Sequence, residues 1–190
     1  MKLLRVNETF VSLQGEGHFT GTAAFFLRFS GCNLCCPFCD TSHQSFTERS
    51  EDDIVAEASR HKPRHIVVTG GEPALQLTSS LVDKLHAAGF FIQVETNGTL
   101  PLPEGIDWVT CSPKGTPVLK SVDELKVLYE GECTDLSIAD RIRAKEYRLQ
   151  PLDTGNPERN RAIVRSCIDC ILQHPRWSLS LQTHKMLDIK

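Results

Sequence analysis

The chain has 190 residues, of which 40% are hydrophobic and 24% are charged, and its formal net charge is −3 at pH 7. This length predicts one domain, residues 1–190, large enough to bury a core around a cofactor. The charge is slightly negative and no run of lysine or arginine occurs, so nothing favours nucleic-acid binding. The longest apolar stretch, Ala23–Phe29, contains Arg28 and is too short to cross a membrane.

The eight cysteines do not have the spacing of a secreted disulfide framework. Residues 1–10 also lack the continuous apolar core of a signal peptide. We therefore expect a cytoplasmic protein, because a reducing compartment keeps thiolates available to metal.

Short runs rich in β-branched and aromatic residues predict strands along the chain. Most of these runs are apolar throughout, which is typical of strands covered on both faces. The expected strands are Ala23–Phe29, His65–Thr69, Phe90–Glu95, Trp108–Cys111, Leu125–Tyr129, Tyr147–Gln150 and Ser178–Gln182.

Three helices are expected between these strands. Ser50 precedes three acidic residues and predicts the start of a helix that runs to Arg60. A second helix, Leu81–Ala88, should end at Gly89. Asn156 and the proline after it predict the start of a third helix. Its expected apolar face consists of Val164, Cys167, Ile168 and Ile171.

The alternation of strands and helices predicts an α/β fold with a parallel sheet. Helices are fewer than strands, and a closed eightfold barrel needs about 250 residues. The sequence therefore favours a partial, open β/α barrel.

The run GCNLCCPFCDT carries Cys32, Cys36 and Cys39 in a CxxxCxxC spacing. Three thiolates can bind three irons of a cubane iron–sulfur cluster, which leaves the fourth iron open to an outside ligand. This pattern resembles the radical S-adenosylmethionine (SAM) superfamily. Cys35 keeps an alternative open, because four cysteines could form a tetrahedral zinc site, and it also permits a second register, Cys32–Cys35–Cys39.

Polar residues follow five of the predicted strands. In parallel sheets, ligands bind beyond the carboxyl ends of the strands. One such segment would be an ordinary turn, but five at one sheet edge predict a binding site. The segments are Thr69–Pro73, Glu95–Gly98, Ser112–Lys114, Gln150–Asp153 and Gln182–Lys185.

The segment before the cysteines adds three candidate binding residues. Gln14 and Glu16 could contact a heterocycle edge that carries adjacent donors and acceptors. Arg28, in an otherwise apolar strand, suits a substrate carboxylate as a bidentate clamp. The alternative is an internal ion pair with Glu8 or Glu16, because a buried charge needs a partner.

Seven motifs identify a family resemblance that extends from about Glu8 to His184. They are ETFVSLQGEG, FLRFSGCNLCCPFCDT, TGGEP, ETNG, CSPK, LQPLD and SLQTHK, in this order. The chain resembles the 7-carboxy-7-deazaguanine synthase family of radical SAM enzymes. The resemblance implies conversion of 6-carboxy-tetrahydropterin to 7-carboxy-7-deazaguanine with loss of ammonia, in queuosine and deazapurine biosynthesis. It also implies a 4Fe–4S cluster, SAM and Mg²⁺ as cofactors.

The resemblance assigns a role to individual residues of this chain. Cys32, Cys36 and Cys39 would bind the cluster, and Thr41 would bind Mg²⁺. The implied substrate contacts are Leu13, Gln14, Gly15, Glu16, Arg28, Thr69, His184 and the last residue, Lys190. The implied SAM contacts are Gly71, Glu72, Ser112, Pro113, Lys114, Gln150, Pro151, Leu152 and Asp153. The chain ends in MLDIK, whereas the family usually ends in proline.

The same resemblance implies a small pterin substrate, a protein reductant such as flavodoxin or ferredoxin, and a homodimer. Two other functions stay open from the cysteine loop. A glycyl-radical activating enzyme would share CxxxCxxC but not the QGEG, CDT and QTHK motifs. A zinc-binding module without catalysis would explain CxxCCxxC but not the five polar strand ends.

Overall fold

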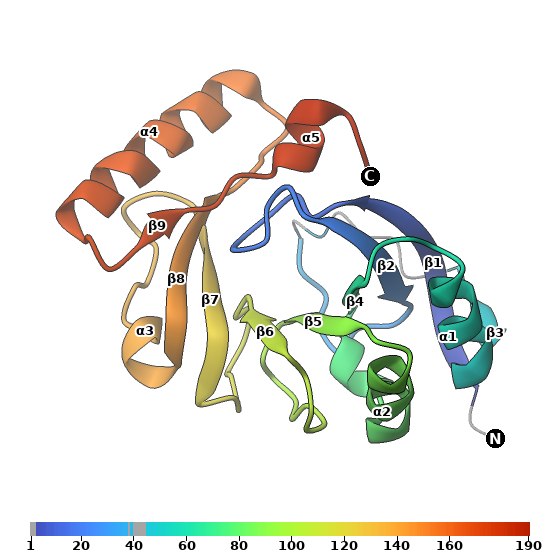
Figure 1. Ribbon diagram of the computed structural model, residues 1–190. Coiled ribbons are helices and arrows are strands. Elements are labelled where there is room, and N and C mark those ends of the chain that lie inside the picture. Colours follow the sequence, from blue (N-terminus) through green and yellow to red (C-terminus); the bar gives the residue numbers. More distant parts are fainter. Residues whose placement is uncertain (1–2, 38, 40–44) are drawn as a thin grey trace.

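The structure is a computed structural model that describes residues 3–37, 39 and 45–190. In this part of the chain, nine strands form one sheet in the order β3-β1-β2-β4-β5-β6-β7-β8-β9 (Figure 1). The strands are β1 Leu4–Leu13, β2 Ala23–Phe29, β3 Thr47–Arg49, β4 His65–Gly70, β5 Phe91–Thr96, β6 Trp108–Cys111, β7 Ser121–Tyr129, β8 Arg143–Pro151 and β9 Ser178–Leu179. The helices are α1 Glu51–Ser59, α2 Ser79–Ala87, α3 Ile138–Arg141, α4 Pro157–Gln173 and α5 Thr183–Leu187, with a short 3-10 turn at Pro73–Leu75.

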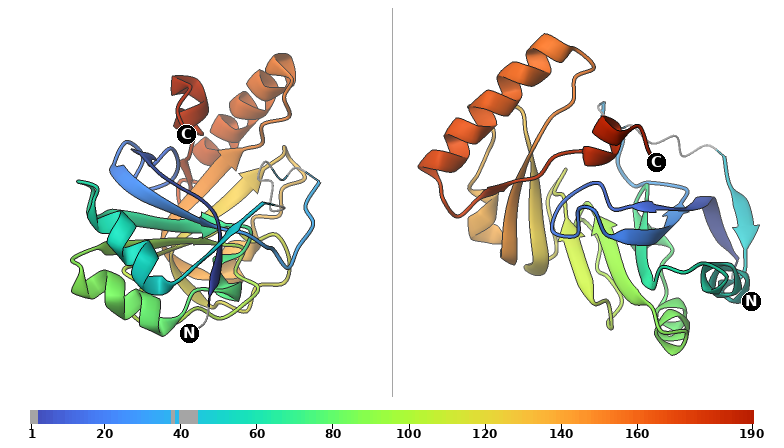
Figure 2. Two further views of the ribbon diagram at one scale, coloured as in Figure 1. Left: turned by 90° about the vertical axis from the view of Figure 1, so that its right-hand side faces the viewer. Right: turned by 45° about the horizontal axis from the view of Figure 1, so that its top comes forward.

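The sheet is curved and open, as expected for a partial barrel. Neighbouring strands from β2 to β9 are parallel, whereas β1 pairs antiparallel with β2 and with β3. The parallel strands therefore end at the same edge, and Figure 2 shows the sheet curving around a concave face. The strands β3 and β9 lie at opposite ends of the sheet order, so the barrel is not closed.

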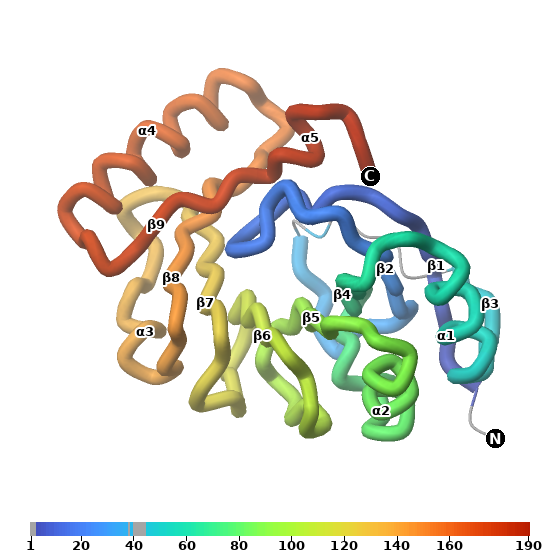
Figure 3. The backbone as a smooth tube through the Cα atoms, viewed as in Figure 1, coloured from blue at the N-terminus to red at the C-terminus, as the bar shows by residue number. Residues whose placement is uncertain are grey.

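Two apolar cores cover the outer face of the sheet. The larger core joins β2, β4 and β5 to α1 and α2, and includes the fully buried Phe25, Ile66 and Leu85. The second core joins β7 and β8 to α3 and α4, and includes Leu125 and Leu149. The backbone trace in Figure 3 shows α1 and α2 together near the N-terminal strands, with α4 at the far end of the sheet. The helices thus leave the concave face available for a ligand.

Local signals in the sequence placed most of these elements. The predicted bounds of β2 and β6 match the structure, and β9 is shorter than expected. Ser50 accepts a hydrogen bond from the backbone N of Asp53 at 3.1 Å, as an N-cap should. Gly89 has a φ of +80°, a left-handed conformation that suits glycine after a helix. The strands β1 and β3 were not predicted.

The predicted apolar face of α4 was partly wrong. The buried residues of this helix are Ile163 and Cys167, whereas Ile168 is 41% exposed. Cys170 and Ile171 pack at the margin of the same core. Residues 163, 167, 170 and 171 follow the i, i+4, i+7, i+8 spacing of one narrow helix face. Two of the four predicted positions, 167 and 171, are correct, and the other two lie one or two residues from the observed ones.

In the described residues, no helix is long and apolar enough to span a membrane.

The corrected face of α4 can be tested with a matched pair of variants. Ile163→Ala should lower the free energy of unfolding by about 2–4 kcal/mol, because it removes buried methyl groups and leaves a cavity. Ile168→Ala should change it by less than about 1 kcal/mol. Urea titrations of both proteins measure the difference. A larger loss for Ile168→Ala would contradict the packing described here.

Candidate active site

A cavity of about 810 Å³ lies on the concave face and reaches the carboxyl ends of the parallel strands. Most of the residues predicted from the sequence line it. From the substrate and cluster sets these are Leu13, Gln14, Gly15, Glu16, Arg28, Thr69, His184, Lys190, Cys32, Cys36 and Cys39. From the SAM set they are Gly71, Ser112, Pro113, Lys114, Gln150, Leu152 and Asp153. Glu72 and Pro151 do not line it, and Thr41 lies outside the described residues.

Backbone contacts with the end of β4 hold the first part of the cysteine loop. The backbone N of Glu72 donates to the carbonyl of Gly31 at 2.9 Å, and that of Gly71 donates to the carbonyl of Phe29 at 3.2 Å. A Cβ on Gly71 would lie 2.0 Å from the Gly31 oxygen and 2.9 Å from the Cβ of Cys32. Only glycine permits this close approach, so the GGEP motif fixes where Cys32 lies.

The donor set of the loop fits an iron–sulfur cluster. Cys32, Cys36 and Cys39 line the cavity, whereas Cys35 does not. Burial raises the pKa of the Cys36 thiol, Lys114 opposes this, and the neighbouring cysteines raise it further. Loading with iron would therefore release protons, because the thiolate is the ligand.

The described residues contain no group of three His, Cys, Asp or Glu side chains placed to hold one metal ion. A cubane cluster binds each thiolate to a different iron, so its ligands need not converge on one point.

Glu72 has a different environment from the one expected for a SAM contact. Its side chain is fully buried and its carboxylate accepts three hydrogen bonds. The donors are the hydroxyl of Thr96 at 2.7 Å, the backbone N of Asn97 at 2.8 Å and the backbone N of Ala74 at 3.0 Å. Glu72 thus joins the ends of β4 and β5 beneath the cavity.

The QGEG segment leads to a buried group of charges. The Lys126 ammonium lies 2.6 Å from Glu16 Oε2 and 3.1 Å from Glu95 Oε2. Burial by itself would raise the pKa of Glu16, but Lys126 outweighs it and holds this pKa at about 2. Burial raises the pKa of Glu95, Lys126 opposes the rise, and the carboxylates of Glu16 and Glu124 add to it.

Lys126 was given no role from the sequence, although a lysine within the otherwise apolar run 125–129 was a visible signal. Glu95 was noted only as part of a polar strand end.

Arg28 forms the ion pair with Glu8 that its apolar strand suggested. Arg28 Nε lies 3.0 Å from Glu8 Oε1, and Lys190 Nζ lies 2.7 Å from Glu8 Oε2. Burial tends to raise the pKa of Glu8, but Lys190 and Arg28 lower it below its ordinary value. The main-chain oxygen of Lys190 accepts a hydrogen bond from the Ser12 hydroxyl at 2.6 Å. These contacts bring residue 190 to the cavity beside Arg28.

Segments near the two ends of the sequence meet at this site. The backbone N of Thr183 donates to the carbonyl of Gly15 at 2.9 Å. A Cβ on Gly15 would lie 2.2 Å from His184 Nδ1, so glycine lets α5 approach the loop after β1. On the neighbouring strand end, Asp153 accepts from Lys185 at 2.8 Å, a bond that lowers the pKa of its carboxyl.

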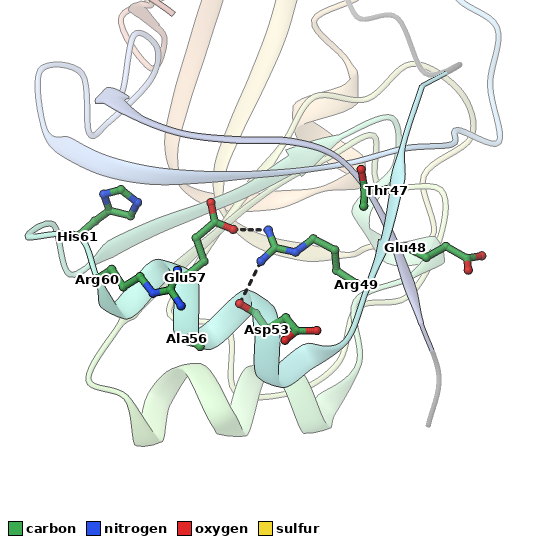
Figure 4. Close-up of a pocket in the computed structure, with 8 residues that line it drawn as sticks. All are labelled: Thr47, Glu48, Arg49, Asp53, Ala56, Glu57, Arg60 and His61. Atoms are coloured by element: carbon green, nitrogen blue, oxygen red, sulfur yellow. Dashed lines mark hydrogen bonds and ion pairs between the residues drawn. The ribbon is translucent and has the colours of Figure 1, made fainter.

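A second hollow, of about 590 Å³, lies between β3 and α1 (Figure 4). Its lining is mainly charged, and Arg49 forms an ion pair there with Glu57 and donates to the carbonyl of Asp53 at 3.0 Å. None of the predicted site residues that the structure describes line this hollow. Most of them line the cavity on the concave face instead.

Comparisons with known proteins agree with this fold and site. The family model described as the radical SAM superfamily matches residues 27–117. A 7-carboxy-7-deazaguanine synthase of Bacteroides thetaiotaomicron is 50% identical over 188 residues, covering 98% of each chain. One from Bradyrhizobium diazoefficiens is 39% identical and covers 97% of this chain and 98% of the relative. The crystal structure of QueE from Escherichia coli superposes with a TM-score of 0.76 at 30% identity, covering 95% of this chain and 94% of the other.

The open β/α sheet and the cysteine loop are those of a radical SAM protein. Within that superfamily, the chain belongs to the 7-carboxy-7-deazaguanine synthase family. These findings favour neither the glycyl-radical activating enzyme nor the zinc-binding module.

The buried position of Glu72 gives a prediction about stability. Glu72→Ala should lower the free energy of unfolding of the SAM-free protein by about 3 kcal/mol or more, because three donors lose a charged acceptor. Ser112→Ala, at the end of a neighbouring strand, should change it by no more than about 0.5 kcal/mol. Chemical denaturation without SAM provides the measurement. Unchanged stability with weaker SAM binding would instead favour a direct contact between Glu72 and SAM.

Proposed function

We propose that this chain converts 6-carboxy-tetrahydropterin to 7-carboxy-7-deazaguanine with release of ammonia, as a radical SAM lyase. The observation that carries the proposal is the single cavity lined by the three cysteines together with Gln14, Glu16 and Arg28. The names of the relatives support the same activity.

Cys32, Cys36 and Cys39 are proposed to hold a 4Fe–4S cluster with one open iron. SAM is proposed to contact Gly71, Ser112, Lys114, Gln150, Leu152 and Asp153. Glu72 and Pro151 do not line the cavity, so they are proposed to act on SAM only indirectly, by holding neighbouring residues in place. When bound, the cluster and SAM supply the one-electron chemistry that starts the reaction.

The residues of the substrate side bind and orient the pterin. Arg28 is proposed to receive the substrate carboxylate, with Glu8 keeping the guanidinium in place at 3.0 Å. Glu16 is ionised at neutral pH because its pKa is about 2, so it can accept hydrogen bonds from N–H groups of the heterocycle. His184 closes against Gly15 and helps to exclude water from this part of the cavity.

Two further proposals rest on the family resemblance. The electron donor is a small redox protein such as flavodoxin or ferredoxin, and the enzyme acts as a homodimer. Two more rest on the sequence itself: the length favours a single domain, residues 1–190, and the cysteine usage favours the cytoplasm, consistent with the eight free cysteines.

Anaerobic turnover of 6-carboxy-tetrahydropterin with SAM and dithionite tests the function. Formation of 7-carboxy-7-deazaguanine and ammonia is expected from the reconstituted protein. Cys36→Ala should lose both iron and activity, because a proposed ligand is removed. Cys35→Ala, a matched control in the same loop, should keep both, since Cys35 does not line the cavity. Equal loss of iron in the two variants would overturn the ligand set, and an inactive wild-type protein would overturn the function.

We also propose that Thr41 provides an oxygen ligand to Mg²⁺ beside the substrate carboxylate. An ion held by one neutral oxygen would bind weakly before substrate arrives, because magnesium gives up its waters reluctantly. Activity should rise with added Mg²⁺, and Thr41→Ala should lose this response while keeping the cluster and uncoupled SAM cleavage. Titrations of activity against Mg²⁺ compare the two proteins. An unchanged magnesium dependence in the variant would mean that the metal is held elsewhere.

A further inference from the structure

One buried lysine joins three separate segments in the wall of the cavity. Lys126 lies on β7, is 5% exposed, and contacts both Glu16 in the segment after β1 and Glu95 on β5. A lysine is rarely buried to this extent without partners. Here its partners are two carboxylates that also line the cavity.

The two carboxylates are held on their other oxygens as well. Glu16 Oε1 accepts from Gln182 Nε2 at 2.8 Å, and Glu95 Oε1 accepts from Gln93 Nε2 at 2.9 Å. A carboxylate has about four acceptor positions, so these bonds leave Glu16 with capacity for two more donors. That capacity suits a heterocycle edge with adjacent N–H groups.

The charges around Lys126 do not balance among the described residues. Glu16, Glu95 and Glu124 all act on its ammonium, and His184 on α5 acts on Glu16. Glu124 accepts from the backbone N of His18 at 3.0 Å, but its Oε1 is buried and finds no hydrogen-bond partner within the described part of the chain. If the ammonium were removed, like charges would be left buried together, and at least one carboxylate would take up a proton.

We propose that Lys126 is a positioning residue for the pterin, which acts by keeping Glu16 ionised and directed at the N–H edge of the substrate. The inference rests on the proposed function, since it concerns the recognition of that substrate. Lys126 acts through its contact with Glu16 in the QGEG segment and takes no direct part in the reaction.

The direction of the pH effect follows from the charges. In the wild-type protein the pKa of Glu16 is about 2, so Glu16 stays ionised throughout the neutral range. Without Lys126, burial would raise this pKa toward that range, because the ammonium that outweighs burial would be gone. Protonation of Glu16 at the lower end of the range would then remove an acceptor. Affinity for the pterin should therefore fall as the pH falls, but only in the variant.

The test measures binding rather than turnover. Pterin-6-carboxylate, the oxidised and unreactive form of the substrate, is titrated calorimetrically into reconstituted, SAM-bound protein from about pH 6 to about pH 9. Lys126→Met should weaken binding on the order of 30-fold at the acidic end, with recovery at the alkaline end. Lys126→Arg keeps the charge and should bind with little dependence on pH.

Lys145→Met is the matched control, because Lys145 lies on the neighbouring strand β8 and pairs with Asp123 at 2.7 Å, yet is 72% exposed. It should bind as the wild-type protein does. Iron content and circular dichroism show whether each variant is folded and loaded.

The outcomes separate this inference from the proposed function. Wild-type protein that neither binds nor turns over the pterin would overturn both. Wild-type binding with an unchanged Lys126→Met, or with a loss that is the same at every pH, would overturn the positioning role alone. If Lys126→Met does not fold, the decision passes to Lys126→Arg and Glu16→Gln. Glu16→Gln should then bind the pterin weakly at every pH. Full binding by Glu16→Gln would overturn the positioning role of Lys126, and so would pH-dependent binding by Lys126→Arg.

Discussion

The close approach of two backbone segments is the constraint on which the rest of the site depends. Gly70 at the end of β4 lies against Phe29, and a Cβ on the next residue, Gly71, would collide with both Gly31 and Cys32. Glu72 then ties the same strand end to β5 through its buried carboxylate. The cysteine loop is thereby held to the edge of the sheet where the other polar strand ends also lie.

The two faces of the sheet differ in charge. The outer face is apolar and packs on the helices, whereas the concave face carries Lys126 and Glu95, with Glu16 beside them, in addition to a small apolar cluster. Burying such charges is costly, and a mutually paired group is often no more stabilising than apolar residues of the same size. The network is therefore better explained by recognition of a polar substrate than by stability of the fold.

Much of the fold and of the site could be predicted from local signals in the sequence. Runs of apolar residues located β2 and β6, and CxxxCxxC with GGEP located the cavity. The strand β1 was missed because polar residues such as Asn7 and Glu8 interrupt its pattern where it faces the cavity. The role of Glu72 was not predictable, because whether a carboxylate faces a ligand or a neighbouring strand end depends on packing. Lys126 was missed for the same reason, since its partners are 110 and 31 residues away in sequence.

The contact between α5 and the loop after β1 also bears on how the protein folds. Thr183 and Gly15 are 168 residues apart, so their hydrogen bond closes nearly the longest loop that the chain can form. Contacts of such sequence separation form late, because the entropy of loop closure must be overcome first. The core around β2, β4 and β5, which supports the cysteine loop, consists of residues 4–94 and does not need that closure. We therefore expect the part that supports the cysteine loop to form first, and the contact of α5 that encloses the substrate side of the cavity to form last.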